Sequence, residues 1–329
     1  MAFSLALFRH NQSFTFILLL IFLLFLWIPD FMNPMPIVHH GMPLYQILEW
    51  FTFNSAHTAI IIAFVVLILQ GVYINFLVSK HDLVIRSTYF PILLYIILGS
   101  IIPDFRTLSP TLIANSFILF ACNSLLNMYK LKTIDNLIFN ASLLIGIASL
   151  ISFQTIFFYA LVIVSLIIFR PFSWREWTIS ICGILVPYIF LLSFLILFDK
   201  FDSYYHANII SIPTSDIYTL PLHRNLLACY IAIMVIAAYF KINAHLNSTT
   251  VKIKKGYSLL RWFIVICFIS FILFGLNENS SLILLAIPIS IILSNYFLLS
   301  AKSFISELLL ILLLTATALI QINYIFNSI

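Results

Sequence analysis

Long apolar segments alternate with short polar turns along the whole chain. A membrane-spanning helix needs about 20 mostly apolar residues, and in lipid its backbone polar groups must be satisfied internally. About eleven segments approach this length. They cover residues 13–29, 56–79, 88–102, 111–128, 134–151, 154–169, 177–198, 225–240, 259–275, 280–298 and 303–326. The predicted fold class is therefore all-α, a polytopic transmembrane helical bundle that forms a single integral membrane domain over residues 1–329.

The loop between the first and second predicted spans contains a shorter predicted helix. In "MPLYQILEWFTF", Leu44, Ile47, Leu48 and Phe51 share one helical face, and Pro43 stands near the first helical position. This pattern predicts a juxtamembrane helix that lies in the interface rather than crossing it.

Small and polar residues inside the spans predict close helix packing. Ser142, Gly146 and Ser149 recur on one face of the fifth span and would let another helix approach closely. A polar stripe of Ser116, Asn123 and Asn127 on the fourth span is typical of hydrogen bonding between helices, with a substrate-lining role as the alternative.

The turn "FRPFSWREW" is explained by helix capping. Ser173 stands three residues before Glu176, which is the spacing of a capping box at the start of the seventh span.

The composition agrees with a membrane protein and excludes several classes. Hydrophobic residues make up 63% of the chain and charged residues 8%, against about 25% charged residues in a soluble domain. Mean hydropathy is +1.13. With seven glycines and no G-x-G-x-x-G or Walker pattern, the chain is not expected to bind a nucleotide, and no cofactor is predicted.

Basic residues gather on one side of the predicted spans. If the N-terminus is cytoplasmic, only Arg106, Lys200 and Arg224 of the sixteen Lys and Arg residues fall outside. Cytoplasmic loops carry such an excess of basic residues. The formal charge of +5 is therefore explained by the orientation of the chain in the lipid bilayer, and it does not indicate a nucleic-acid partner. We predict a bacterial inner-membrane protein with a cytoplasmic N-terminus and a periplasmic C-terminus.

Candidate chemistry lies on the outer side. Asp30 ends the first span in "WIPDF", and Asp104 ends the third in "IIPDFRTLSP". A carboxylate that is partly removed from water holds a proton more readily, which suits a general base acting on a hydroxyl. Arg106 and Arg224 could clamp a phosphate.

Three more outer-side residues complete the substrate-binding candidates: Glu49, His57 and His206. His57 begins the second span, where it could join Asp30 in a site or cap the helix. For the acids themselves, the alternative is that they are solvated turn residues at helix ends.

The order of these parts resembles the GT-C superfamily of membrane glycosyltransferases. The shared features are a cytoplasmic N-terminus, an acid after the first span, a juxtamembrane helix in the first outer loop and an acid in the second. The stretch "NASLLIGIASLISFQTIFFYALVIVSLIIFRPFSWREW" is similar to the fifth-to-seventh span region of that superfamily. The resemblance covers residues 1–200, the GT-C-like core, and leaves an outer loop and C-terminal helices in residues 201–329.

The resemblance implies roles for two residues. Asp30 matches the catalytic acid position and Asp104 the acid of the second outer loop. In this chain "DFR" replaces the D-x-D of metal-dependent members, so no metal is predicted. Through "LSPTLIANSFILF" and "FRPFSWREW", the whole chain also resembles an uncharacterised multi-pass membrane family of Bacteroidota.

Two functional hypotheses follow. The first is a GT-C-like transferase that takes a sugar from a polyprenyl-phosphate-linked saccharide at the outer face, with Asp30 as base. The alternative is a non-catalytic envelope protein, either an assembly scaffold or a transporter without a proton relay.

Overall fold

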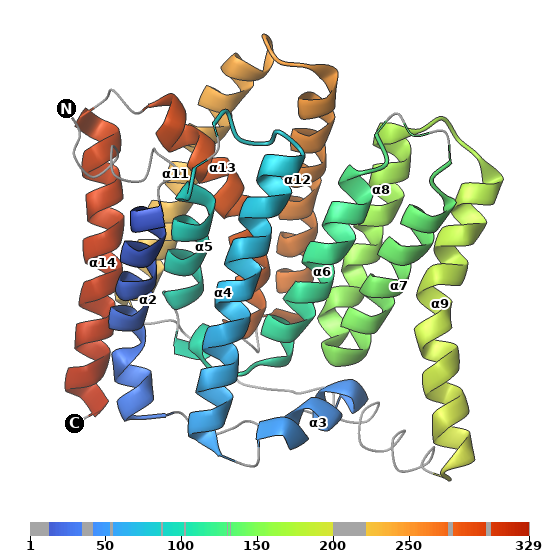
Figure 1. Ribbon diagram of the computed structural model, residues 1–329, viewed down its shortest axis with the longest axis horizontal. Coiled ribbons are helices and arrows are strands. Elements are labelled where there is room, and N and C mark those ends of the chain that lie inside the picture. Colours follow the sequence, from blue (N-terminus) through green and yellow to red (C-terminus); the bar gives the residue numbers. More distant parts are fainter. Residues whose placement is uncertain are drawn as a thin grey trace.

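The computed structural model is a bundle of helices (Figure 1). It describes residues 13–34, 42–52, 55–86, 88–101, 103–129, 131, 133–199, 222–275, 279–300 and 304–328, and no β-strand occurs within these ranges. The α-helices are α2 (Ser13–Met32), α3 (Pro43–Glu49), α4 (Ala56–Lys80), α5 (Phe90–Ser100), α6 (Pro110–Leu126), α7 (Asp135–Ile151), α8 (Tyr159–Phe169), α9 (Trp174–Leu197), α11 (Leu222–Leu246), α12 (Val251–Ser270), α13 (Ala286–Leu299) and α14 (Phe304–Ser328). Shorter helical turns are η1 (Trp50–Thr52), η2 (Pro103–Arg106), η3 (Phe153–Phe158), η4 (Phe271–Gly275, a π-helix) and η5 (Asn279–Leu285).

Within the described ranges, five helical segments are long and apolar enough to cross a membrane. They are Ala56–Lys80, Trp174–Leu197, Leu227–Leu246, Val251–Leu273 and Leu282–Leu299. These segments confirm a helical membrane protein. Six further apolar segments have described lengths of 10–17 residues, so the figure of about eleven spans stays a prediction.

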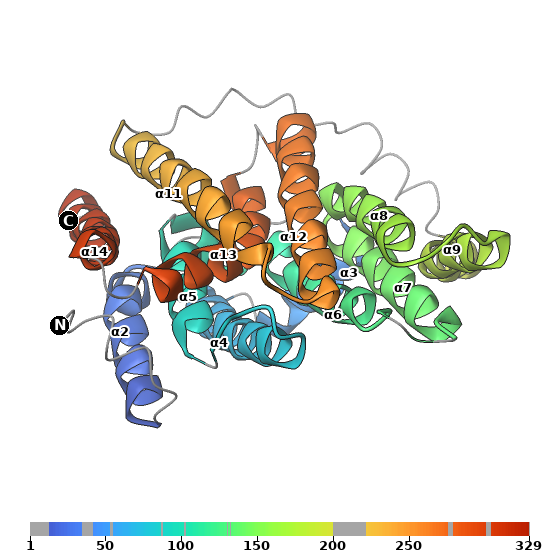
Figure 2. The ribbon, with the colours of Figure 1, turned by 90° about the horizontal axis from the view of Figure 1, so that it is seen from above.

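The helices run up and down the bundle side by side, with α14 and α2 at one edge and α9 at the other (Figures 1 and 2). α2 ends at the lower end in Figure 1, where α3 runs across the bundle. Asp30 is in the last turn of α2 and contacts Arg106 of η2. The helix α4, whose last residue is Lys80, ends at the upper end. We call these the Asp30 end and the Lys80 end.

The predicted close packing is present between α7 and α9. A Cβ atom added at Gly183 would lie 2.7 Å from the Cβ of Ser142, and one at Gly146 would lie 3.0 Å from the carbonyl oxygen of Ile184. The hydroxyls of Ser149 and Tyr188 are 2.7 Å apart. Small residues on both helices therefore bring the two backbones together, as predicted from α7 alone.

The polar stripe on α6 bonds α4 and the residue that follows it. Gln70 of α4 donates to the Ser116 hydroxyl (2.7 Å) and to the carbonyl of Leu112 (2.7 Å). A ring nitrogen of His81 lies 3.0 Å from Oδ1 of Asn123. These contacts agree with hydrogen bonding between helices as the role of the stripe.

The juxtamembrane helix forms where it was predicted, but its buried side differs. Pro43 opens α3, and Leu44 and Leu48 pack against the core. Ile47, expected on the same face, is 57% exposed, whereas Tyr45 is fully buried. The reason is polar, because the Tyr45 hydroxyl reaches a backbone carbonyl inside the bundle.

Ser173 occupies the predicted N-cap of α9, but it makes no capping hydrogen bond from its side chain. A carboxylate oxygen of Glu176 lies 3.9 Å from Nε of Arg170. The capping-box prediction was therefore wrong in its bonding, and Glu176 faces a cation instead.

Candidate functional site

A buried ion pair joins two of the predicted site residues. Nη1 of Arg106, the last residue of η2, donates to Oδ2 of Asp30 in the last turns of α2. Arg106 is 0% exposed and Asp30 3% exposed. The pair therefore brings together the proposed base and one proposed phosphate ligand from separate segments of the chain.

Apolar and polar contacts of Trp27 hold α2 in place beside the pair. Trp27 is buried one turn before Asp30, and its indole Nε1 donates to the hydroxyl of Ser100 at the end of α5 (3.1 Å). Its ring meets that of Phe64 on α4 edge to face, with centroids 5.3 Å apart. These contacts hold the end of α2 against α4 and α5, next to the Asp30–Arg106 pair.

A second contact ties α3 to the same region. The hydroxyl of Tyr45 donates to the carbonyl of Leu108, two residues after η2 (2.7 Å). The next residue, Ser109, caps α6 by accepting a hydrogen bond from the backbone N–H of Leu112 (3.2 Å). The segment that carries Arg106 is thus held by α3 on one side and by the start of α6 on the other.

The guanidinium of the Asp30–Arg106 pair has the geometry of an anion-binding group. A guanidinium presents a planar fork of donors that fits carboxylate and phosphate oxygens equally well. In the described state the fork meets the Asp30 carboxylate, so an anionic group entering this junction would compete with Asp30 for Arg106. A carboxylate in a site shielded from water has the chemistry that a general base needs.

The remaining candidates are only partly described. Asp104 lies in η2, Glu49 ends α3 and Arg224 is in the first turn of α11, but their side chains lie outside the description. His57 is exposed in the first turn of α4. His206 lies outside the described residues. Of the predicted set, the structure brings Asp30 and Arg106 together.

Sequence reasoning missed a polar cluster at the Lys80 end. The turn between α4 and α5 is held by Asn295 of α13, which donates to the carbonyl of Leu83 (2.7 Å) and accepts from the backbone N–H of Ile85 (3.3 Å). The Tyr257 hydroxyl of α12 donates to the same Leu83 carbonyl (2.8 Å). Asn295 inside an apolar span was the available signal, because a buried amide must find partners.

No group of three or more His, Cys, Asp or Glu residues that could hold a metal ion occurs in the described part of the chain.

A family model matches residues 35–326 of the chain, which is most of its length. Its description is "Family of unknown function (DUF6427)". The chain belongs to this family. The match covers the helices after α2, including α3 and η2, up to two residues before the end of α14, whereas Asp30 lies just before the matched residues. Searches of curated proteins and of solved structures find no match to the chain.

Proposed function

We propose that this DUF6427 protein is a GT-C-like transferase that uses a polyprenyl-phosphate-linked sugar at the outer face of the bacterial inner membrane. The observation that supports the proposal is the buried Asp30–Arg106 pair, which joins a carboxylate to a guanidinium, a group whose geometry suits phosphate. In this proposal residues 1–200 form the catalytic core, with the N-terminus cytoplasmic and the C-terminus periplasmic.

The proposed reaction uses each member of the pair once. The donor phosphate binds Arg106 and displaces the carboxylate of Asp30. An acceptor hydroxyl then attacks the anomeric carbon, the bond from that carbon to the phosphate oxygen breaks, and Asp30 takes the hydroxyl proton. Polyprenyl phosphate leaves with its negative charge held by Arg106. Asp104, Arg224, Glu49, His57 and His206 are proposed to contact the sugar and phosphate.

The membrane environment supports this choice of donor. A polyprenyl tail stays in lipid while its phosphate sits at the interface, and the ion pair lies where α2 ends. The proposal requires the donor phosphate to reach the buried Arg106 from this interface while the tail remains in lipid.

A second function is favoured by the same burial. Asp30 is 3% exposed and already bonded, which is also how an ion pair fixes two segments in a non-catalytic scaffold or transporter. In that case a paired apolar replacement would preserve function, because only the junction matters.

Deletion of the gene, followed by mass spectrometry of lipid-linked saccharides, tests the transferase. Accumulation of an unused polyprenyl-linked sugar is expected. An unchanged pool of these lipids in the deletion strain would contradict the proposal.

A further inference from the structure

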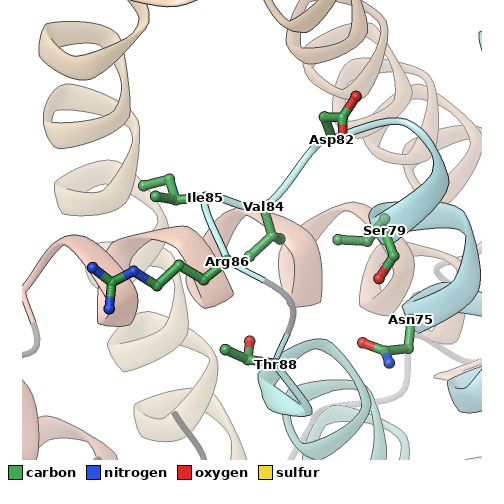
Figure 3. Close-up of a pocket in the computed structure, with 8 residues that line it drawn as sticks. Asn75, Ser79, Asp82, Val84, Ile85, Arg86 and Thr88 are labelled. Carbon is green, nitrogen blue, oxygen red and sulfur yellow. The ribbon is translucent and has the colours of Figure 1, made fainter. Parts of the chain in front are cut away.

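A partly enclosed cavity of about 200 Å³ lies at the Lys80 end, beside the turn between α4 and α5. Its polar lining comes from Asn75 and Ser79 on α4, Asp82 and Arg86 in the turn, and Thr88 before α5. Figure 3 shows Asn75 and Ser79 on one side of the space and Thr88 on the other, with Val84 between them. The cavity is far along α4 from the Asp30–Arg106 pair, so it is a separate feature.

Two other helices, α12 and α13, hold the turn beside this cavity. Besides Asn295 and Tyr257, Lys252 of α12 donates to the carboxylate of Asp82 (2.8 Å). Gly256 packs so closely on the turn that an added Cβ would lie 2.7 Å from Cδ2 of Leu83. The turn is therefore held in one shape by long-range contacts.

The interior has unmet hydrogen-bonding capacity. Oδ1 of Asn75 and Oγ1 of Thr88 are buried and have no hydrogen-bond partner in the part of the chain that the structure describes. Thr88 is 2% exposed as a whole residue. Buried polar atoms without partners are costly, so a ligand that satisfies both would be stabilised.

The atoms that need partners favour a donor. An amide oxygen only accepts hydrogen bonds, and a hydroxyl can accept as well as donate. The space also lies at the C-terminal end of α4, where the helix dipole favours positive charge. A primary ammonium, with three N–H donors and one positive charge, meets these requirements.

The mouth of the cavity favours a negatively charged group. Arg86 is exposed, and its guanidinium extends away from Asn75 in Figure 3. Asp82 at the rim is already paired with Lys252. A ligand with its ammonium inside would place a phosphate, two carbons away, toward Arg86.

We propose that this cavity binds an ethanolamine phosphate headgroup, with the ammonium between Asn75 and Thr88 and the phosphate on Arg86. A membrane lipid is the source, namely phosphatidylethanolamine. Val72 and Phe76 are 42% and 53% exposed and lie on the same face of α4 as Ser79 at the mouth. This apolar strip gives the acyl chains a surface that continues from the headgroup along the helix.

The test is native mass spectrometry of the full chain in detergent, titrated separately with phosphatidylethanolamine, phosphatidylcholine and phosphatidylglycerol. Phosphatidylcholine has no N–H donor and phosphatidylglycerol has no ammonium, so each should be retained about tenfold less, the worth of one charge-assisted hydrogen bond. Equal retention of the three lipids would overturn the proposal.

Two variants localise the binding. Thr88→Val keeps the side-chain shape and should lower phosphatidylethanolamine retention about tenfold by removing one acceptor. Arg86 lies on the exposed rim, so Arg86→Gln tests the phosphate contact without disturbing the core. Thr178→Val on α9 is the matched control and should retain wild-type binding. Unchanged retention in both cavity variants would contradict the site.

Free phosphoethanolamine distinguishes the two sources of this chemistry. The proposal expects it to displace the lipid only weakly, because it lacks the acyl chains. If it bound as tightly as the lipid, the ligand would be a soluble phosphoamine and the lipid assignment would be wrong.

Discussion

Arg106 and Asp30 are 76 positions apart in the chain, yet the guanidinium of one donates to the carboxylate of the other. Both side chains are buried. The contact closes α2 against the segment after α5 and defines the Asp30 end of the bundle. Two predictions follow from it.

Replacing Arg106 by Met should strongly destabilise the protein. The change leaves the Asp30 carboxylate buried without its cation, and breaking a buried ion pair from one side costs about 3–5 kcal/mol. Thermal unfolding in detergent, followed by tryptophan fluorescence, measures the loss. A melting temperature equal to that of the wild type would show that the pair does not hold the junction.

Replacing both partners, with Asp30→Leu and Arg106→Met, should recover most of that stability. A buried ion pair exchanged for apolar residues of similar size is often neutral or stabilising, since no charge is left buried alone. The same unfolding measurement on the double variant checks this. A double variant less stable than Arg106→Met alone would contradict the pairwise account.

Close approach of α7 and α9 gives a third prediction. Gly183→Ala would place its Cβ 2.7 Å from the Cβ of Ser142 and 2.8 Å from the carbonyl oxygen of Phe139, so backbones must separate. Gly71→Ala on α4 is the matched control, because its nearest neighbour is a side-chain methyl at 3.3 Å. We expect Gly183→Ala to lose about 1–3 kcal/mol of unfolding free energy, as overpacking does, and the control to lose clearly less. Equal melting temperatures would rule out tight packing here.

The pH dependence of stability gives a fourth prediction. Burial lowers the pKa of His81 below its ordinary value of 6.5, with Lys80 and Lys252 acting in the same direction and the Asn123 hydrogen bond and Asp82 opposing. The folded protein therefore binds fewer protons than the unfolded chain below pH 6.5. Stability should fall as the pH drops through that value, and the fall should flatten below the folded pKa.

His81→Gln removes this titration while keeping a polar side chain near Asn123. Thermal unfolding of both proteins between pH 5 and pH 8, a range of about one to two units around the ordinary pKa of His, checks the prediction. The difference in stability between variant and wild type should change with pH below neutrality. A constant difference would show that His81 does not titrate on unfolding.

The helical membrane architecture could be predicted from the sequence because hydrophobic length and period are local signals. The same holds for a close helix contact at the Gly146 face, although not for α9 as the helix that makes it, and for Pro43 at the start of α3. Which side of α3 is buried could not be predicted, because it depends on a carbonyl at Leu108, far along the chain.

The sequence predicted two residues of the candidate site, but not the contact between them. Asp30 and Arg106 both stood out as charges at span ends, but their pairing depends on how α2 packs on α4 and α5. The Lys80 end was overlooked for a related reason. Thr88 and Asn75 are ordinary residues in sequence, and only the fold leaves their oxygens buried beside a cavity.

The most direct test of the transferase compares Asp30→Asn with the wild type in a deletion strain, with lipid-linked saccharides measured by mass spectrometry. Asn keeps the shape of Asp30 but cannot take a proton, so accumulated donor should persist even where the variant reaches the wild-type level in the membrane. The Asp30→Leu and Arg106→Met double variant, restored in stability, should fail in the same way. Consumption of the donor at the wild-type rate by either variant would contradict catalysis by Asp30 and favour a structural role for the pair.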